Sequence, residues 1–443
     1  MAIPAQYERR HIYHFTHIAN IPSILQHGLL AKNKLSSTHT SIASESIQTR
    51  RDSLSIPVHG KTLHDYVPLY FCSICPMFLS VVIKKIFDQR SLVYIEFPIS
   101  IIENPGVLFT DIAANSTIEP QFYDDCQKLT ELDWDAIDYK RWSWTDEVKR
   151  KKMAEALIPE SVHLSSAARL VVWNRHAKNY ILTEAAHLMI TPPEISYEMS
   201  KVRPHFFKAF MHGEPRLSIV PGPIEIRGQF TKAVNQTIAR RKTPPQNPLF
   251  GNLQALLNGL KNDFYCLDCT EALGDLEAIN GIHTETVDLH TQHVVKHLQK
   301  LECYQNLDAN SKIITQISAY LHDIGKGVTE KLVNGKYMTN ERHPLYALPL
   351  VARLLAKEVL TITEQEIRKI LFLVCYHDFF GDLLKDRRSI EEIVNITQDE
   401  QDIHMLYALC CADSLAISSD WFKTRSPENF LNKILDNIRL RND

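Results

Sequence analysis

Five segments in the second half of the chain carry apolar residues at positions i, i+3 and i+4, the spacing of an amphipathic helix. They are residues 289–301, 313–322, 345–355, 364–376 and 404–416. The first half instead contains short runs rich in β-branched and aromatic residues, 91–97 and 169–173, which predict strands. Residues 20–28 predict a short helix that Asn20 caps and Gly28 ends. The sequence therefore predicts an α+β front domain followed by an all-α rear domain.

Length and composition place this pair of domains in the ordinary globular class. A chain of 443 residues with 44% hydrophobic residues has enough apolar material for two or three cores. It lacks an apolar stretch of roughly 20 residues and an apolar signal segment near its start, so we expect no membrane partner. Nine cysteines, an odd number, fit a reducing compartment, so we expect a cytoplasmic protein.

Two features bear on domain boundaries and metal content. The basic run Arg240-Arg241-Lys242 precedes a proline-rich stretch and predicts a solvated linker, although such a run can also contact nucleic acid. We expect domains at 1–205 and 276–443, with a connector at 206–275. Two C-x-x-C pairs, at 72/75 and 266/269, would form a zinc site only if they converged, which we do not expect.

Histidine and aspartate recur at helix-sized intervals in the second half. A lone histidine is more often a surface or core residue than a ligand, but this set falls on separate predicted helices that can face one interior. Imidazole and carboxylate together suit divalent Fe, Mn, Ni, Co or Zn, and an aspartate can bridge two ions. The candidate metal ligands are His290, His322, Asp323, His343, His377 and Asp413.

The segment His322-Asp-Ile-Gly-Lys326 resembles the HD-domain superfamily of metal-dependent phosphohydrolases. The resemblance covers about residues 276–443 and implies an HD-type helical fold with one or two divalent metal ions, Mg²⁺ among them. It also implies that Lys326 neutralises phosphate charge at the catalytic site. Asp378 stands where some two-metal members carry a second histidine, which leaves the number of metal ions open.

The front half carries a different set of motifs. It opens with a His-x-Thr element at His14 and Thr16, and continues with Arg50-Arg51 and the block 65–71, Asp-Tyr-Val-Pro-Leu-Tyr-Phe. Later, Glu155 lies in a short apolar run directly after the basic residues 149–152, a setting that favours a desolvated, functional carboxylate. Neither a G-x-x-x-x-G-K-[ST] loop nor a G-x-G-x-x-G loop occurs, so any nucleotide must bind a non-Rossmann scaffold.

The order of these motifs over about residues 9–205 resembles the DarT family of DNA ADP-ribosyltransferases. That family consists of toxins, known from toxin–antitoxin systems, that transfer ADP-ribose from NAD to bases of single-stranded DNA. The resemblance implies that His14 and Thr16 bind the NAD ribose with Asn20 nearby, and that Tyr70 stacks on nicotinamide. It also implies that Arg51, with Arg50 as the alternative, holds the pyrophosphate.

Under the same resemblance, Glu155 is the catalytic carboxylate and Arg51 steadies the reacting geometry. Cleavage of the nicotinamide bond develops positive charge on the ribose, which a fixed carboxylate stabilises. An acceptor base must be unpaired to reach that centre, so we expect single-stranded DNA as partner, contacted by residues 38–51 and 149–152. The linked rear domain would then process or regulate the modification.

Three alternatives remain open at this point. In the first, the front domain binds a nucleotide without catalysis, and the chain is a nucleotide-signalling phosphohydrolase. In the second, the front domain modifies RNA or protein rather than DNA. In the third, the histidine and aspartate set is structural, and the rear domain is a helical scaffold that binds a protein partner.

Overall fold

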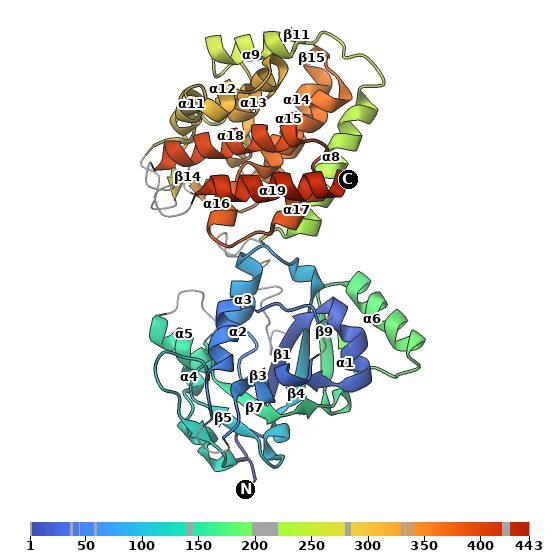
Figure 1. Cartoon of the computed structure of the whole chain (residues 1–443), viewed down its shortest axis with the longest axis vertical. Coiled ribbons are helices and arrows are strands. Elements are labelled where there is room, and N and C mark those ends of the chain that lie inside the picture. The colour runs from blue at the N-terminus through green and yellow to red at the C-terminus, as the bar shows by residue number, and fades with distance from the viewer. Residues whose placement is uncertain are drawn as a thin grey trace. The chain divides into compact units, whose positions relative to one another are not determined.

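The chain forms two compact units, each with its own core (Figure 1). The computed structural model describes residues 2–35, 39–43, 45–56, 60–139, 145–196, 220–279, 285–328, 332–333, 336–338, 341–418 and 426–442. The first unit comprises residues 1–83 and 87–212, and the second comprises residues 84–86 and 213–443.

The first unit is built around an eight-stranded sheet with strand order β10-β9-β4-β1-β3-β7-β5-β6. All neighbouring strands are antiparallel except the parallel pair β10 and β9. The strands are β1 (His11–His17), β3 (Tyr66–Tyr70), β4 (Leu92–Pro98), β5 (Leu108–Thr110), β6 (Phe122–Tyr123), β7 (Glu155–Pro159), β9 (Arg169–Val172) and β10 (Glu194–Ser196). The strands predicted at 91–97 and 169–173 are confirmed as β4 and β9.

The register of the central strands aligns three polar or aromatic residues across the sheet. Tyr13 on β1 is opposite Tyr70 on β3, and Tyr70 is opposite Glu155 on β7. Residues directly opposite each other in antiparallel strands have neighbouring side chains. Residues that are far apart in the sequence are therefore placed in one row by strand pairing.

Short helices surround this sheet: α1 (Ile21–His27), α2 (Glu45–Asp52), α3 (Pro76–Ile83), α4 (Trp134–Asp138), α5 (Asp146–Lys152) and α6 (Arg175–His187). A separate strand pair joins β2 (Leu29–Leu30) to β8 (Ser161–Val162). The helix predicted at 20–28 is confirmed as α1, and Gly28 ends it with φ of 76°. The predicted cap is wrong: Asn20 occupies the N-cap position, but its side chain makes no capping hydrogen bond.

The second unit is mainly helical. Its longer helices are α8 (Pro223–Arg240), α9 (Leu253–Asn262), α11 (Val287–Leu298), α13 (Ala309–Leu321), α14 (His343–Lys357), α15 (Glu364–Tyr376), α18 (Glu400–Ile417) and α19 (Pro427–Asn442). Its shorter helices are α10 (Asp268–Glu271), α12 (Glu302–Gln305), α16 (Phe379–Leu384) and α17 (Ile390–Val394). Its strands are β11 (Phe250–Asn252), β12 (Ala278–Ile279), β13 (Leu332–Val333), β14 (Lys336–Met338) and β15 (Val359–Thr361). The five predicted amphipathic helices are confirmed as α11, α13, α14, α15 and α18.

The described part of the expected connector, residues 220–275, contributes to the helical core. Phe230 on α8 and Leu256 on α9 are buried in the same hydrophobic cluster as the central helices. Arg241, expected in a solvated linker, donates a hydrogen bond of 2.8 Å to the carbonyl of Leu360. The apolar faces of α8 and α9 thus pack against the other helices of the second unit. The division between the two units falls between residues 212 and 213 rather than at the ends of the expected connector.

Two other expectations concern membranes and zinc. In the part of the chain that the structure describes, no helix combines the length and apolar character needed to cross a bilayer. The C-x-x-C pairs at 72/75 and 266/269 lie in different units, and no described cysteine belongs to a cluster of candidate metal ligands.

Gly28 is a position where the fold requires glycine. A Cβ atom built there would lie 2.4 Å from the carbonyl oxygen of Val162, whereas one at Gly106, with φ of 78°, would meet nothing closer than 3.5 Å. Both Gly28→Ala and Gly106→Ala place a side chain at a positive φ, which costs a non-glycine residue roughly 1–3 kcal/mol. We expect Gly28→Ala to lower the free energy of unfolding further, because a backbone clash cannot be relieved by a side-chain rotation. Hydrogen exchange of β4 peptides measures both losses, and equal losses would contradict this explanation.

Candidate functional site

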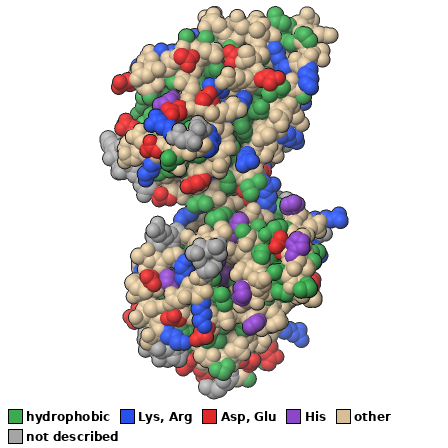
Figure 2. Space-filling model, turned by 45° about the vertical axis from the view of Figure 1, so that its right-hand side comes forward, with side chains coloured by type: hydrophobic (Ala, Val, Ile, Leu, Met, Phe, Trp, Pro, Cys, Tyr) green, Lys and Arg blue, Asp and Glu red, His purple; other side chains and the backbone are tan. Residues whose placement is uncertain are grey.

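A cavity of about 770 Å³ in the first unit brings together the residues predicted to bind NAD. Its walls come from β1, α1, α2, β3 and β7 and from the loops that join them. Figure 2 shows several histidine side chains on the visible face of this unit. The predicted residues among the lining are His14, Thr16, Asn20, Arg51, Tyr70 and Glu155.

Glu155 begins strand β7 and is almost completely buried. Its Oε1 atom accepts hydrogen bonds from Arg51 Nη1 at 3.2 Å and from the backbone N–H of Ala114 at 2.8 Å, and Oε2 lies 3.3 Å from the same Nη1. A buried carboxylate needs such partners to offset its desolvation. Arg50 is exposed, so of the two adjacent arginines the structure places Arg51 against Glu155.

Asn20 connects strand β1 to the segment that follows α1. Its Nδ2 atom donates to Thr16 Oγ1 at 3.0 Å and to the carbonyl of Thr40 at 2.9 Å, and its Oδ1 accepts from the Thr40 N–H at 2.9 Å. These bonds explain why Asn20 does not cap α1: the side chain pairs with the backbone of Thr40 instead. The cavity wall near Thr16 is therefore held by a buried polar network.

His14 and Tyr70 both present neutral side chains to the cavity. The Nδ1 of His14 lies 3.0 Å from the Pro68 carbonyl, which can only accept, so Nδ1 carries the hydrogen and Nε2 is left as an acceptor. Burial lowers the pKa of His14 to about 4, although the bond to Pro68 acts in the opposite direction. Burial also raises the pKa of Tyr70 well above its usual value, and its ring stacks on Phe15 at 5.9 Å between centroids.

One further cavity residue was missed by the sequence analysis. His64 lines the cavity beside the predicted residues, is buried, and has Nδ1 3.2 Å from Asp52 Oδ1. Burial lowers the pKa of His64, although the hydrogen bond to Asp52 raises it. His64 directly precedes the block 65–71, but the sequence carries no signal that pairs it with Asp52.

Two residues of the basic run 149–152, which was expected to contact DNA, are paired within the first unit. Lys152 is buried and donates to the carbonyls of Ile137 at 2.7 Å and Tyr139 at 2.8 Å. Lys151 is paired with Asp133 and Glu147, each at 3.0 Å. Lys152 is therefore a structural residue. Part of the other expected DNA segment, 38–51, lies outside the described residues, including residue 38.

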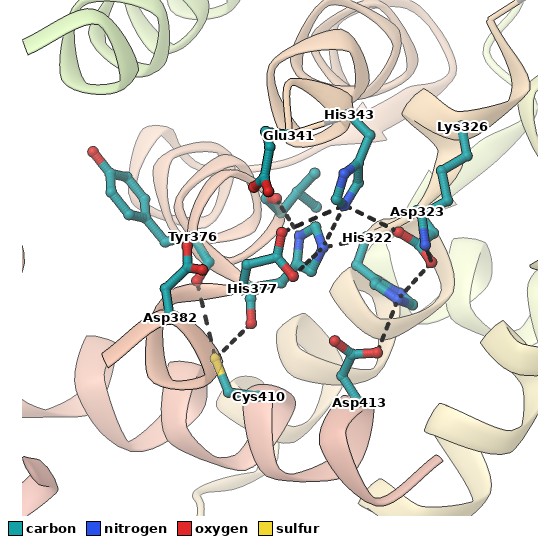
Figure 3. A network of polar contacts seen from close by, with 12 residues as sticks. His322, Asp323, Lys326, Glu341, His343, Tyr376, His377, Asp382, Cys410 and Asp413 are labelled. Atoms are coloured by element: carbon teal, nitrogen blue, oxygen red, sulfur yellow. Dashed lines mark hydrogen bonds and ion pairs between the residues drawn. The ribbon is translucent and has the colours of Figure 1, made fainter. Parts of the chain in front are cut away.

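In the second unit, all six predicted metal ligands converge in one place, and all except His290 are labelled in Figure 3. They come from different helices, and they meet because each lies near a helix end or on the face that points into the bundle. His290 is on α11, His322 and Asp323 follow α13, His343 begins α14, His377 follows α15, and Asp413 is on α18. His290 Nε2 lies 2.9 Å from Asp413 Oδ1, and His343 Nε2 lies 3.0 Å from His377 Nε2.

Asp323 belongs to two clusters of candidate ligands, one with His290 and His322 and the other with His343 and His377. Its Oδ2 lies 3.3 Å from His322 Nε2 and 3.8 Å from His290 Nε2. Its Oδ1 lies 3.4 Å from His343 Nε2 and 3.8 Å from His377 Nε2. Each oxygen of this carboxylate thus faces a different pair of histidines, the arrangement of a ligand that bridges two ions.

The protonation pattern of these side chains fits a divalent cation. His322 Nδ1 and His377 Nδ1 lie 2.8 and 2.9 Å from the carbonyls of Ala319 and Val374, so both Nδ1 atoms donate and each Nε2 faces the cluster, where a bound cation would replace its proton. Within the described residues, His322 Nε2 and Asp323 Oδ1 are buried without a hydrogen-bond partner. Burial lowers the pKa of His322, but Asp323 and Asp413 outweigh it and raise that pKa to about 10. The site therefore favours positive charge.

Asp378 and Lys326 complete the surroundings of this cluster. Asp378 lies with Oδ2 3.5 Å from His343 Nε2 and Oδ1 3.6 Å from His377 Nε2, so a carboxylate stands beside the second pair of histidines. In the sequence, His377-Asp378 resembles the extra ligands of two-metal members of the HD superfamily, in some of which a histidine stands at the position of Asp378. Lys326 Nζ lies 2.6 Å from Asp323 Oδ2, at the edge of the site.

Comparisons with known proteins concern the first half of the chain. The family model of DarT, the ssDNA thymidine ADP-ribosyltransferase, matches residues 13–206. A DNA ADP-ribosyl transferase of Thermus sp. strain 2.9 is 30% identical over 177 residues, which are 39% of this chain and 85% of that protein. A second, of Thermus aquaticus, is 32% identical over 156 residues, 34% of this chain and 68% of that protein.

A third relative, of Thermosipho africanus, is a fusion of a DNA ADP-ribosyl transferase with a DNA ADP-ribosyl glycohydrolase, and is 29% identical over 157 residues, 34% of this chain and 40% of that protein. The solved structure of Thermus sp. 2.9 DarT with ADP-ribosylated ssDNA is 28% identical, with a TM-score of 0.41, and covers 45% of this chain and 97% of its own. Through its first unit, the chain belongs to the DarT family of DNA ADP-ribosyltransferases.

Proposed function

We propose that the first unit transfers ADP-ribose from NAD to a base of single-stranded DNA. The observation that carries this proposal is the buried Glu155, held by Arg51 on the wall of a cavity that also presents His14, Thr16 and Asn20. The named relatives act on DNA, and one structure of Thermus sp. DarT holds NAD⁺. The cavity has room for a dinucleotide, since ligand pockets commonly enclose about 300–1,000 Å³.

The chemistry of the step fits the polarity of the cavity. Loss of nicotinamide leaves positive charge on the ribose carbon, and a carboxylate fixed beside that carbon stabilises the transition state more than the ground state. Arg51 and the Ala114 N–H hold Glu155 in one orientation, so little reorganisation is needed as the charge develops. The neutral His14 can accept a hydrogen bond from a ribose hydroxyl through Nε2.

Removing the charge of Glu155 provides the direct test. We expect Glu155→Gln to lower transfer by about 100-fold or more, because an amide of the same shape cannot stabilise the developing cation. Mass spectrometry of a single-stranded oligonucleotide after incubation with NAD measures the transfer. A control oligonucleotide in duplex form should remain unmodified, because its bases are stacked.

The same experiment decides between acceptors. RNA and protein pools are incubated with NAD in parallel with the DNA, and their masses are measured. Transfer to RNA or protein but not to DNA would contradict the DNA assignment. A chain that modifies none of the three would favour the alternative of a nucleotide-binding front unit without catalysis.

We further propose that the second unit is an HD-type, metal-dependent phosphohydrolase. The observation that supports this is Asp323, whose two oxygens face two separate pairs of histidines. His290, His322, Asp323 and Asp413 would hold one ion, and Asp323, His343 and His377 a second. Bound divalent ions such as Mn²⁺, Fe²⁺ or Mg²⁺ would supply Lewis-acid chemistry at phosphate. Lys326, at the edge of this site, would pair with the phosphate charge of the substrate.

The proposed number of ions is tested by metal analysis of the full chain. We expect about two Mn²⁺ per chain for the unaltered protein and about one for His290→Ala and for His343→Ala, because each variant removes a ligand of one cluster only. Asp323→Ala should lose both, because it removes the shared ligand. Plasma mass spectrometry after dialysis measures the content. Equal metal content in Asp323→Ala and His290→Ala would contradict a bridging role.

A substrate for the second unit follows from its linkage to the first. The Thermosipho africanus relative joins a transferase to a glycohydrolase, which supports a processing role for a linked enzyme. We expect the full-length Glu155→Gln variant, in which transfer is strongly reduced, to cleave a phosphate linkage of an ADP-ribosylated oligonucleotide in the presence of Mn²⁺. The product mass measures the cleavage, and Glu155→Gln combined with Asp323→Ala is the control. An unchanged mass with metal-loaded protein would contradict processing.

A further inference from the structure

His64 is a buried histidine on the cavity wall that the chemistry described so far does not use. It is 6% exposed and lies just before strand β3, and the cavity that it lines is the one that holds Glu155 and Arg51. Its Nε2 atom is buried and has no hydrogen-bond partner among the described residues. A buried polar atom without a partner costs free energy, so a bound substrate that donates a hydrogen bond would remove that cost.

The Asp52 carboxylate sets the tautomer of His64. Nδ1 lies 3.2 Å from Asp52 Oδ1, and an ionised carboxylate can only accept, so Nδ1 carries the hydrogen. Nε2 then presents a lone pair rather than a hydrogen. Burial lowers the pKa of His64, which favours the neutral imidazole that a general base requires. A base oriented by a third group is the usual arrangement of a catalytic histidine.

Glu155 is less suited to accept a proton from the incoming base. Its oxygens already accept hydrogen bonds from Arg51, and Oε1 accepts a further one from the Ala114 N–H. Arg51 and Asp52 are consecutive residues at the end of helix α2, and they contact Glu155 and His64 respectively. One helix terminus thus positions a charge-stabilising carboxylate and a neutral imidazole around the same cavity.

On the basis of the proposed function, we propose that His64 Nε2 is the general base that accepts the proton of the acceptor nucleobase. In this step the N–H bond of the base breaks and its proton moves to Nε2, while the nitrogen bonds to the ribose carbon of NAD. The bond from that carbon to nicotinamide breaks, and its electron pair leaves with neutral nicotinamide. The imidazolium then pairs with Asp52, whose side chain is 73% exposed and gives the proton a route to water.

Chemical rescue tests this assignment with the full-length chain, NAD and a single-stranded oligonucleotide. We expect His64→Gly to lower kcat by about 100-fold or more, the usual contribution of a general base, and to leave KM for NAD nearly unchanged. Added imidazole should restore at least about tenfold, because the truncated side chain opens space on the cavity wall for a free base. His187→Gly, at an exposed histidine at the end of α6, is the matched control. Its kcat should equal that of the unaltered chain, and added imidazole should not change it.

Two milder variants keep the test decisive if His64→Gly does not fold. His64→Gln can accept a hydrogen bond but cannot hold a proton, so kcat should stay low while NAD still binds. Asp52→Asn permits the other tautomer and should lower kcat at least about tenfold with little change in KM, since Asp52 is largely exposed. Unaltered kcat in His64→Gln, or a low kcat in folded His64→Gly that imidazole does not raise, would overturn the role of His64. Failure of the unaltered chain to modify DNA would instead overturn the proposed function.

Discussion

The buried ion pair of Arg51 and Glu155 is the interaction on which the front site depends. The two side chains are 9% and 1% exposed, so neither charge is well solvated, and the loss of one partner would strand the other at a cost of about 3–5 kcal/mol. A hydrophobic pair of similar volume would commonly stabilise a fold as well or better. The pair also joins helix α2 to strand β7, residues 104 positions apart. Stability alone therefore does not account for a charged pair at this position, whereas the chemistry proposed for the cavity requires one.

The two units solve the problem of a buried carboxylate in different ways. Glu155 receives its hydrogen bonds from the protein, through Arg51 and the Ala114 N–H, and needs no ion. Asp323 is equally buried, but its Oδ1 has no hydrogen-bond partner among the described residues and faces two histidine nitrogens. A carboxylate whose oxygens both accept hydrogen bonds suits a site that stabilises charge on an organic substrate. A carboxylate with an oxygen that accepts none, surrounded by imidazoles, suits a metal cation.

Much of the fold was predictable because its signals are local. The apolar periodicity of helices such as α13 and α15 and the β-branched run of β4 act over one element at a time. The cap assigned to Asn20 failed because its side chain instead contacts Thr40, a pairing that local rules do not describe. The sequence did not show that the helical unit includes α8 and α9, for a related reason. These two helices carry no recognisable motif, and only their packing in the hydrophobic cluster shows that they belong to the second unit.

The candidate sites divide along the same line. Ligands spaced on separate helices were predictable as a set, since a bundle interior can gather them, whereas the pairing of His64 with Asp52 and the approach of Asp378 to His343 depend on tertiary contacts. Comparison of motifs also singles out Arg51 and gives no role to Asp52, the next residue along the chain. On a helix, consecutive side chains point about 100° apart, so the end of α2 can direct Arg51 to Glu155 and Asp52 to His64. Function can thus reside in a residue beside the motif.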